Sequence, residues 1–139
     1  MHSLRTLKGA GAVFMAAWWI HSIDHMRRGV SASPDGVIWS GTFVAMLAVI
    51  SLTLIFTEQK SAALFAAIVF PLVGVGVLLS HLPPDWGPLS DPIIFDSNTD
   101  GWSIVAVMTE VLAAFWLGYV AAKAVRSEQL SSVSAGPVS

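Results

Sequence analysis

Two histidines and an aspartate end the first apolar stretch of the sequence, in the run from Trp18 to His25. On a helix that turns ~100° per residue, His21 and His25 lie one turn apart on the same face, and Asp24 lies about 60° to one side of His21. Ionisable side chains in an apolar helix usually mark contact with a partner, handling of ions or protons, or a bound metal. This run is therefore the first candidate for a site.

A metal ion is the first chemistry that these residues suggest. The His-x3-His pair directs two ring nitrogens to one point, and His81 and Glu110 from other segments would complete a set of nitrogen and oxygen ligands, with Asp24 as a further carboxylate. The chain has no cysteine, so thiolate ligands, iron–sulfur clusters and disulfides are excluded. Imidazole and carboxylate donors favour zinc or copper, with an iron or manganese carboxylate site as a variant.

Three other uses of the same residues stay open. His25 and His81 on different helices are suited to be the two axial ligands of a b-type haem. A hydrogen bond between His21 and Glu110 that only fixes helix register would fit a non-catalytic accessory subunit of a membrane complex. A buried glutamate beside a histidine could also relay protons in a transporter, although the sequence shows no inverted repeat.

The composition indicates which secondary-structure elements position these side chains. Of the 139 residues, 55% are hydrophobic and only 12% are charged, and the mean hydropathy is +0.71. Such values are typical of an integral membrane protein. We expect an all-α chain, a four-helix transmembrane bundle with helices at about 9–28, 37–56, 61–80 and 101–124, an ordered outer loop between the last two, a single domain at 1–126 and a disordered tail at 127–139.

Local patterns support these boundaries. The run 37–56 is uncharged and the connection 57–60 is so short that the next helix must fold back as a hairpin. Pro71 lies near the centre of that third helix, where a packing kink is the simpler prediction and a hinge the alternative. The first segment also resembles a cleaved signal peptide in its basic start and apolar core, but no small-x-small cleavage site follows that core.

The distribution of charge predicts the topology. Arg5, Lys8, Lys60, Lys123 and Arg126 fall on the side of both termini, whereas only Arg27 and Arg28 fall on the other. The positive-inside rule then places the N- and C-termini in the cytoplasm, and we expect a bacterial plasma membrane. Pairing with Asp24, Asp35 or loop aspartates would neutralise the two outer arginines.

Depth can be counted from the helical rise of 1.5 Å per residue. His21 lies about 11–12 Å below the outer end of the first helix, and Glu110 lies about 13–14 Å below the same surface. The residues that share a helix face with Glu110 are small: Ala106, Ala113 and Ala114. We therefore predict that the first helix packs against the fourth and that His21 meets Glu110.

Several function classes are excluded or weak. The net charge of -2 gives no basic surface for nucleic acid. No P-loop, nucleophile elbow, His-Glu-x-x-His or dinucleotide-binding motif is present. The sequence leads to a small integral membrane protein with a histidine and carboxylate metal site near the outer face, in a metal-binding or electron-transfer role. The lipid bilayer and other membrane chains, or further copies of this chain in a homo-oligomer, are the expected partners, with a membrane oxidoreductase as the candidate complex.

Overall fold

The computed structural model describes residues 2–29, 33–94 and 99–134, and these residues form four helices and no strand. The helices are α1 (His2–Arg28), α2 (Asp35–Phe56), α3 (Ala62–His81) and α4 (Gly101–Ser134). The prediction of an all-helical chain is confirmed.

The first and the last helix are longer than the sequence indicated. α1 begins at His2, well before the predicted start at residue 9, because Leu7 is already buried in the core. α4 continues to Ser134, past the predicted end at residue 124 and into the segment predicted as a disordered tail. Ala124 still packs on the core, and the Ser127 hydroxyl donates to its carbonyl oxygen at 2.7 Å. Residues 135–139 of that tail lie outside the described part.

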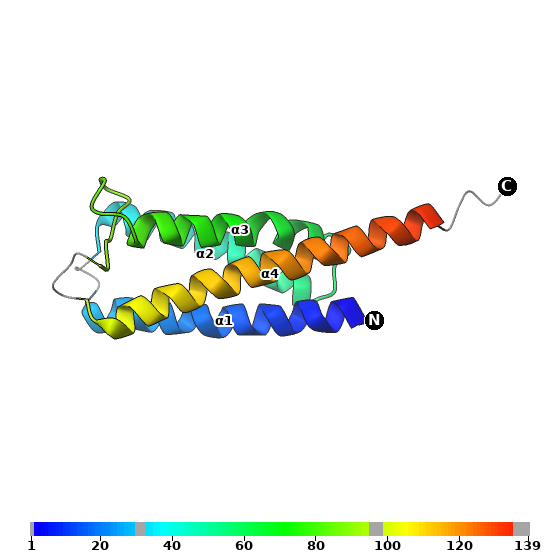
Figure 1. Ribbon diagram of the computed structural model, residues 1–139, viewed down its shortest axis with the longest axis horizontal. Helices are drawn as coiled ribbons and strands as arrows, with labels where there is room; N and C mark the ends of the chain where they lie inside the picture. The colour runs from blue at the N-terminus through cyan, green and yellow to red at the C-terminus, as the bar shows by residue number, and fades with distance from the viewer. Residues whose placement is uncertain (1, 30–32, 95–98, 135–139) are drawn as a thin grey trace.

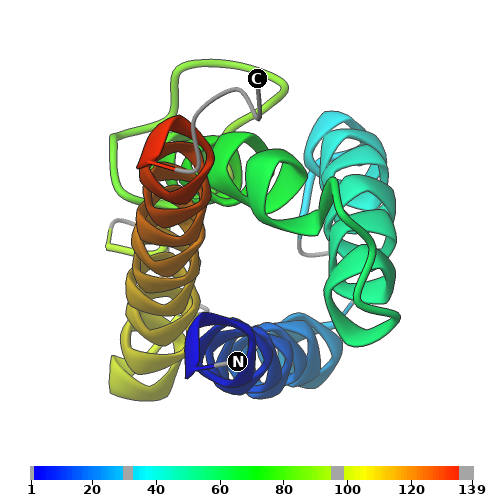
Figure 2. The same ribbon diagram turned by 90° about the vertical axis from the view of Figure 1, so that its right-hand side faces the viewer.

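The helices surround a common core in an antiparallel arrangement. Viewed end-on, α1, α4, α3 and α2 form the four sides of a square in that order (Figure 2). α4 packs along both α1 and α3. The contact of α4 with α1 was predicted, and so was the hairpin in which α2 packs against α3. α1 and α2 contact each other much less. The start of α1 and the end of α4 lie at one end of the bundle, and the loop that follows α3 lies at the other (Figure 1).

The core nearest the termini is close-packed and apolar. The rings of Phe14 and Phe70 meet edge to face with centroids 4.6 Å apart. α3 and α4 approach so closely that a Cβ atom on Gly118 would lie 2.7 Å from Cδ of Pro71. The absence of a side chain at Gly118 is thus what admits the proline ring.

Three of the helices are long and apolar enough to cross a membrane: α2, α3 and the first 31 residues of α4. Their outward faces are apolar, with Phe43, Met46, Leu72 and Leu112 all exposed. α1 does not meet the same criterion over its described residues. It carries Arg5 and Lys8 near its start. An apolar exterior around a partly polar interior is the arrangement that a bilayer requires.

Candidate metal centre

Three histidines from two helices meet at the loop end of the bundle. His21 and His25 lie one turn apart on α1, with ring centroids 4.7 Å from each other. His81 is the last residue of α3, and its ring centroid lies 5.0 Å from that of His21 and 5.5 Å from that of His25. One nitrogen from each ring falls within 4.8 Å of the other two. The three imidazoles could therefore hold one metal ion.

His21 is held by the contact that the sequence predicted. Its Nδ1 atom forms a short hydrogen bond with Oε2 of Glu110 on α4, and both side chains are buried. The carboxylate accepts the Nδ1 proton, so Nε2 keeps a lone pair. Nε2 is buried and has no hydrogen-bond partner in the protein. A buried polar atom without a partner is costly, and a metal ion would satisfy it.

His81 is oriented by the loop that follows it. Its Nδ1 lies 2.8 Å from the backbone carbonyl oxygen of Asp91, which accepts the proton. The loop is fixed there by two backbone hydrogen bonds, from Asp91 N to Ser80 O at 2.8 Å and from Ile93 N to His81 O at 3.0 Å. Nε2 of His81 is thus left as the ligand atom.

His25 has a similar support. Its Nδ1 lies 3.1 Å from Oγ of Ser33, and that hydroxyl donates to Oδ2 of Asp91 at 2.9 Å. Nη2 of Arg28, which can only donate, also lies 3.2 Å from this Nδ1. Nδ1 of His25 therefore either accepts from Arg28 or donates to Oγ of Ser33, and only the second tautomer leaves Nε2 with a lone pair for a metal. His21 and His81 each have one nitrogen tied to an outer partner and the other available, which is the usual arrangement of metal-bound imidazoles, and a bound ion would select the same tautomer of His25.

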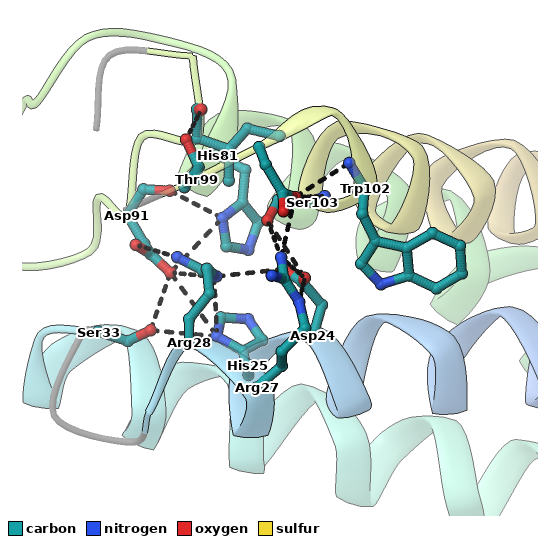
Figure 3. A network of polar contacts seen from close by, with 12 residues as sticks. Asp24, His25, Arg27, Arg28, Ser33, His81, Asp91, Thr99, Trp102 and Ser103 are labelled. Atoms are coloured by element: carbon teal, nitrogen blue, oxygen red, sulfur yellow. Dashed lines mark hydrogen bonds and ion pairs between the residues drawn. The ribbon is translucent and has the colours of Figure 1, made fainter. Parts of the chain in front are cut away.

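A network of ion pairs lies beside the histidines and contains Asp24 (Figure 3). Oδ1 of Asp24 accepts from Arg27 at 2.9 Å and from Ser103 at 3.2 Å, and Oδ2 accepts from Arg28 at 3.1 Å. Arg27 also reaches Asp100 at 2.9 Å. Asp24 thus lies apart from the three histidines, with both oxygens engaged. The predicted neutralisation of Arg27 and Arg28 by Asp24 and loop aspartates is confirmed.

Asp91 joins this network to the histidines. Nη1 and Nη2 of Arg28 lie 3.4 and 3.2 Å from its two oxygens, and the side chains are only 1% and 2% exposed. Burial raises the pKa of Asp91, but hydrogen bonds from Arg28 and Ser33 and the charge of Arg28 outweigh it and bring the pKa below its ordinary value. The carboxylate therefore stays charged and balances the buried guanidinium.

A cavity of about 550 Å³ borders the histidines. Beyond the three rings and Glu110, the walls are mainly apolar side chains of α1, α2 and α3: Phe14, Trp18, Val44, Ala48, Val73 and Val77. Trp18 lines the cavity, whereas Trp19 and Trp116 are exposed. The histidine cluster therefore has a space beside it into which a further metal ligand could fit.

The distances suit a single ion and disfavour a haem. Two nitrogens on one tetrahedral zinc ion lie about 3.3 Å apart, since each is ~2.0–2.1 Å from the metal. Small side-chain rotations would bring the three nitrogens from within 4.8 Å to that spacing. A porphyrin between His25 and His81 would need the space of His21, whose ring lies 4.7 and 5.0 Å from theirs.

Sequence reasoning missed two residues that orient the site, Ser33 and Asp91. Ser33 lies in a turn-rich connector, and Asp91 is one of several aspartates in the outer loop. The one available signal was that the loop carries aspartates while Arg27 and Arg28 lie on the same side. That signal indicated an ion pair but not which aspartate forms it.

No protein-family model matches this chain, and comparisons with curated proteins and with solved structures give no match either.

Proposed function

We propose that this chain is a small integral membrane protein that binds one transition-metal ion through His21, His25 and His81. The observation that carries the proposal is the convergence of three imidazoles around a buried Nε2 of His21 that lacks a partner. Three neutral nitrogen donors with a fourth position open suit zinc, and imidazole is also a good ligand for copper. With copper, electron transfer in a membrane oxidoreductase is the role that we propose.

In this proposal Glu110 and Asp24 act from outside the set of direct ligands. Glu110 fixes the ring of His21 and makes its free nitrogen more basic, as carboxylates behind metal-bound histidines do. Asp24 neutralises the two arginines beside the site. Both were predicted as ligands, and the hydrogen bonds that they make favour the supporting role.

The proposal includes four membrane spans with both ends of the chain in the cytoplasm of a bacterium. Three helices have the length and composition for it, and α1 packs beside α4. The charged groups at the loop end of α1 are paired within the protein, which lowers the cost of placing them at a membrane surface. The excess of basic residues on the side of the termini supports the orientation.

Metal content is the direct test. The protein, stripped with a chelator and reloaded with Zn2+ or Cu2+ in lipid nanodiscs, should hold one ion per chain by elemental analysis. His21→Ala, His25→Ala and His81→Ala should each lose it, whereas His2→Ala, at the other end of α1, should not. Circular dichroism checks that the variants keep their helices.

Glu110→Gln separates the two roles of the carboxylate. If Glu110 only supports His21, this replacement should weaken metal affinity about 10–100-fold and leave one ion per chain. If the variant no longer holds the ion, Glu110 is itself a ligand. If the wild type takes up no stoichiometric ion, the metal proposal is wrong. If, in addition, other membrane chains co-purify with it equally well after the histidines are replaced, the accessory-subunit role takes its place. A Soret band would instead identify haem.

A further inference from the structure

The cavity beside the three histidines has a polar end and a long apolar end. We infer that it binds a single-chain amphiphile whose oxygen head group, such as a carboxylate, takes the open position on the metal and whose hydrocarbon tail lies between α1, α2 and α3. This inference rests on the proposed metal-binding function and adds the class of ligand to it.

The shape of the cavity fits a chain. Along α1 its walls run from Phe14 to Met26, which is about 18 Å at ~1.5 Å per residue, and along α2 they run from Val37 to Ala48, about 16 Å. A volume of about 550 Å³ is in the range of small-molecule sites. A space that is long, apolar and this large matches a hydrocarbon tail better than a compact polar substrate.

The polar groups in the walls direct the head group to the histidines. The hydroxyls of Ser40 and Thr42 are already bonded to carbonyl oxygens of their own helix, Val37 O at 3.2 Å and Ile38 O at 2.8 Å. The metal ion that His21 Nε2 would help to hold, by contrast, keeps one position open to a further ligand. A head group therefore finds its complement at the metal end and not along the walls.

Ligand chemistry selects a head group with a free oxygen lone pair. A metal ion held by three imidazoles keeps a fourth position for an oxygen donor. Arg27 and Arg28 pair with three carboxylates, those of Asp24, Asp91 and Asp100, so that these carboxylates and Glu110 together offset both guanidinium groups and a divalent ion. The head group is therefore selected by its lone pair, which a carboxylate offers to the ion and an alkylammonium does not.

The mouth of the cavity lies on the flank of the bundle. Met26, Gly41 and Thr42 line the cavity and are themselves exposed, and α1 and α2 contact each other only weakly. α2 is one of the helices able to span a membrane. A molecule dissolved in the lipid could therefore enter sideways, tail and head together, without first crossing the outer loop.

Cobalt-loaded protein in lipid nanodiscs tests the inference, because the visible spectrum of Co2+ reports the coordination of the ion. Octanoate should change the spectrum at a concentration roughly tenfold or more below that needed for acetate, since a buried methylene contributes up to about fourfold in affinity. Octylamine, which is cationic at neutral pH, should leave the spectrum unchanged.

Two glycine variants provide the matched control. A Cβ atom on Gly76, which lines the cavity, meets nothing within 4 Å, so Gly76→Leu would fill the tail space without moving the backbone. It should bind Co2+ like the wild type and lose the preference for octanoate over acetate. Gly9→Leu, in open space on α1 away from the cavity, should keep the preference.

The outcomes separate the two proposals. If Co2+ does not bind at all, the metal site is wrong and the amphiphile falls with it. If Co2+ binds but octanoate is no better than acetate, or if Gly76→Leu shows the same preference as the wild type, the tail does not lie in the cavity and only the metal site stands.

Discussion

The two halves of the bundle are stabilised by different means. In the half nearest the termini, α3 and α4 are in close contact through small residues, and the rings of Phe14 and Phe70 fill the space between helices. In the half nearest the outer loop, three histidines, three buried carboxylates and a buried guanidinium occupy the interior next to a cavity. Close packing stabilises the first half, and paired charges stabilise the second.

The contrast shows how a small membrane protein can hold a polar site. Lipid is as apolar as the core, so burial of apolar surface gives little stability and close packing must supply it. The packed half fixes the crossing of α1, α3 and α4, and this crossing brings His21, His81 and Glu110 together. The polar half can then carry a cavity and unpaired ligand atoms that would not be stable by themselves.

The largest expected effect is at Arg28, whose loss should damage the polar half only. Arg28→Met leaves Asp24 and Asp91 buried without their shared partner, which should lower the free energy of unfolding by about 3–5 kcal/mol. Unfolding in mixed detergent micelles measures it. Arg27→Met, at a guanidinium that is 42% exposed, should cost much less. Equal stability of Arg28→Met and the wild type would contradict the dependence on charge.

A pair of alanine substitutions should sharpen the comparison, because their effects have opposite signs. Gly118→Ala places Cβ 2.7 Å from the rigid ring of Pro71 in the packed half and should destabilise by about 1–3 kcal/mol. Gly76→Ala adds a Cβ to open space beside the cavity and should stabilise by up to about 1 kcal/mol through helix propensity. The same unfolding measurement serves both. Destabilisation by Gly76→Ala would mean that the cavity is filled by side chains.

The smallest expected effect is a change of folding stability with pH, and it should come from the polar half. The pKa of Asp91 is lowered in the folded state, so the stability that it contributes is present above its ordinary pKa of 3.8 and is lost as the pH falls through the lower folded value. The backbone N–H of Ser103 and the guanidinium of Arg27 lower the pKa of Asp100 in the same direction. The thermal midpoint should therefore change little through these groups at neutral pH and fall below about pH 4.

The Asp91→Asn variant checks the source of that fall. It should be less stable at neutral pH and show a shallower loss of stability in acid, because it no longer takes up a proton there. Amide exchange in residues 82–94 should rise before exchange in the packed half. Acid loss of equal steepness in wild type and variant would assign the effect to other carboxylates.

The sequence was most informative where lipid constrains it. The uncharged runs of α2 and α3 gave helices that begin and end within two residues of the prediction. The meeting of His21 with Glu110 followed from counting residues from the same membrane surface, because helical rise is fixed. Both inferences needed only local geometry.

The rest depended on contacts that no local pattern encodes. Asp24 is one residue from His25 in the sequence, yet Arg27 and Arg28 take its oxygens. Nothing in the loop distinguishes Asp91 from Asp85, and only the path of the folded loop brings Asp91 against His81 and Arg28. The length of α4 was also underestimated, because a serine-rich composition does not prevent helix where the preceding turn is already packed.

The hydrogen bonds from Asp91 and Ile93 to the last carbonyls of α3 have a consequence for how the outer loop can vary. They clamp the chain immediately beside His81. The segment before this clamp is also fixed, because Trp86 donates to Leu79 O at 2.8 Å and both Trp86 and Leu89 line the cavity. An epitope tag that shows which face of the membrane the loop occupies is therefore best inserted at the exposed Pro84 or Asp85. A deletion of even one residue between Asp91 and Ile93 would instead pull the clamp out of register.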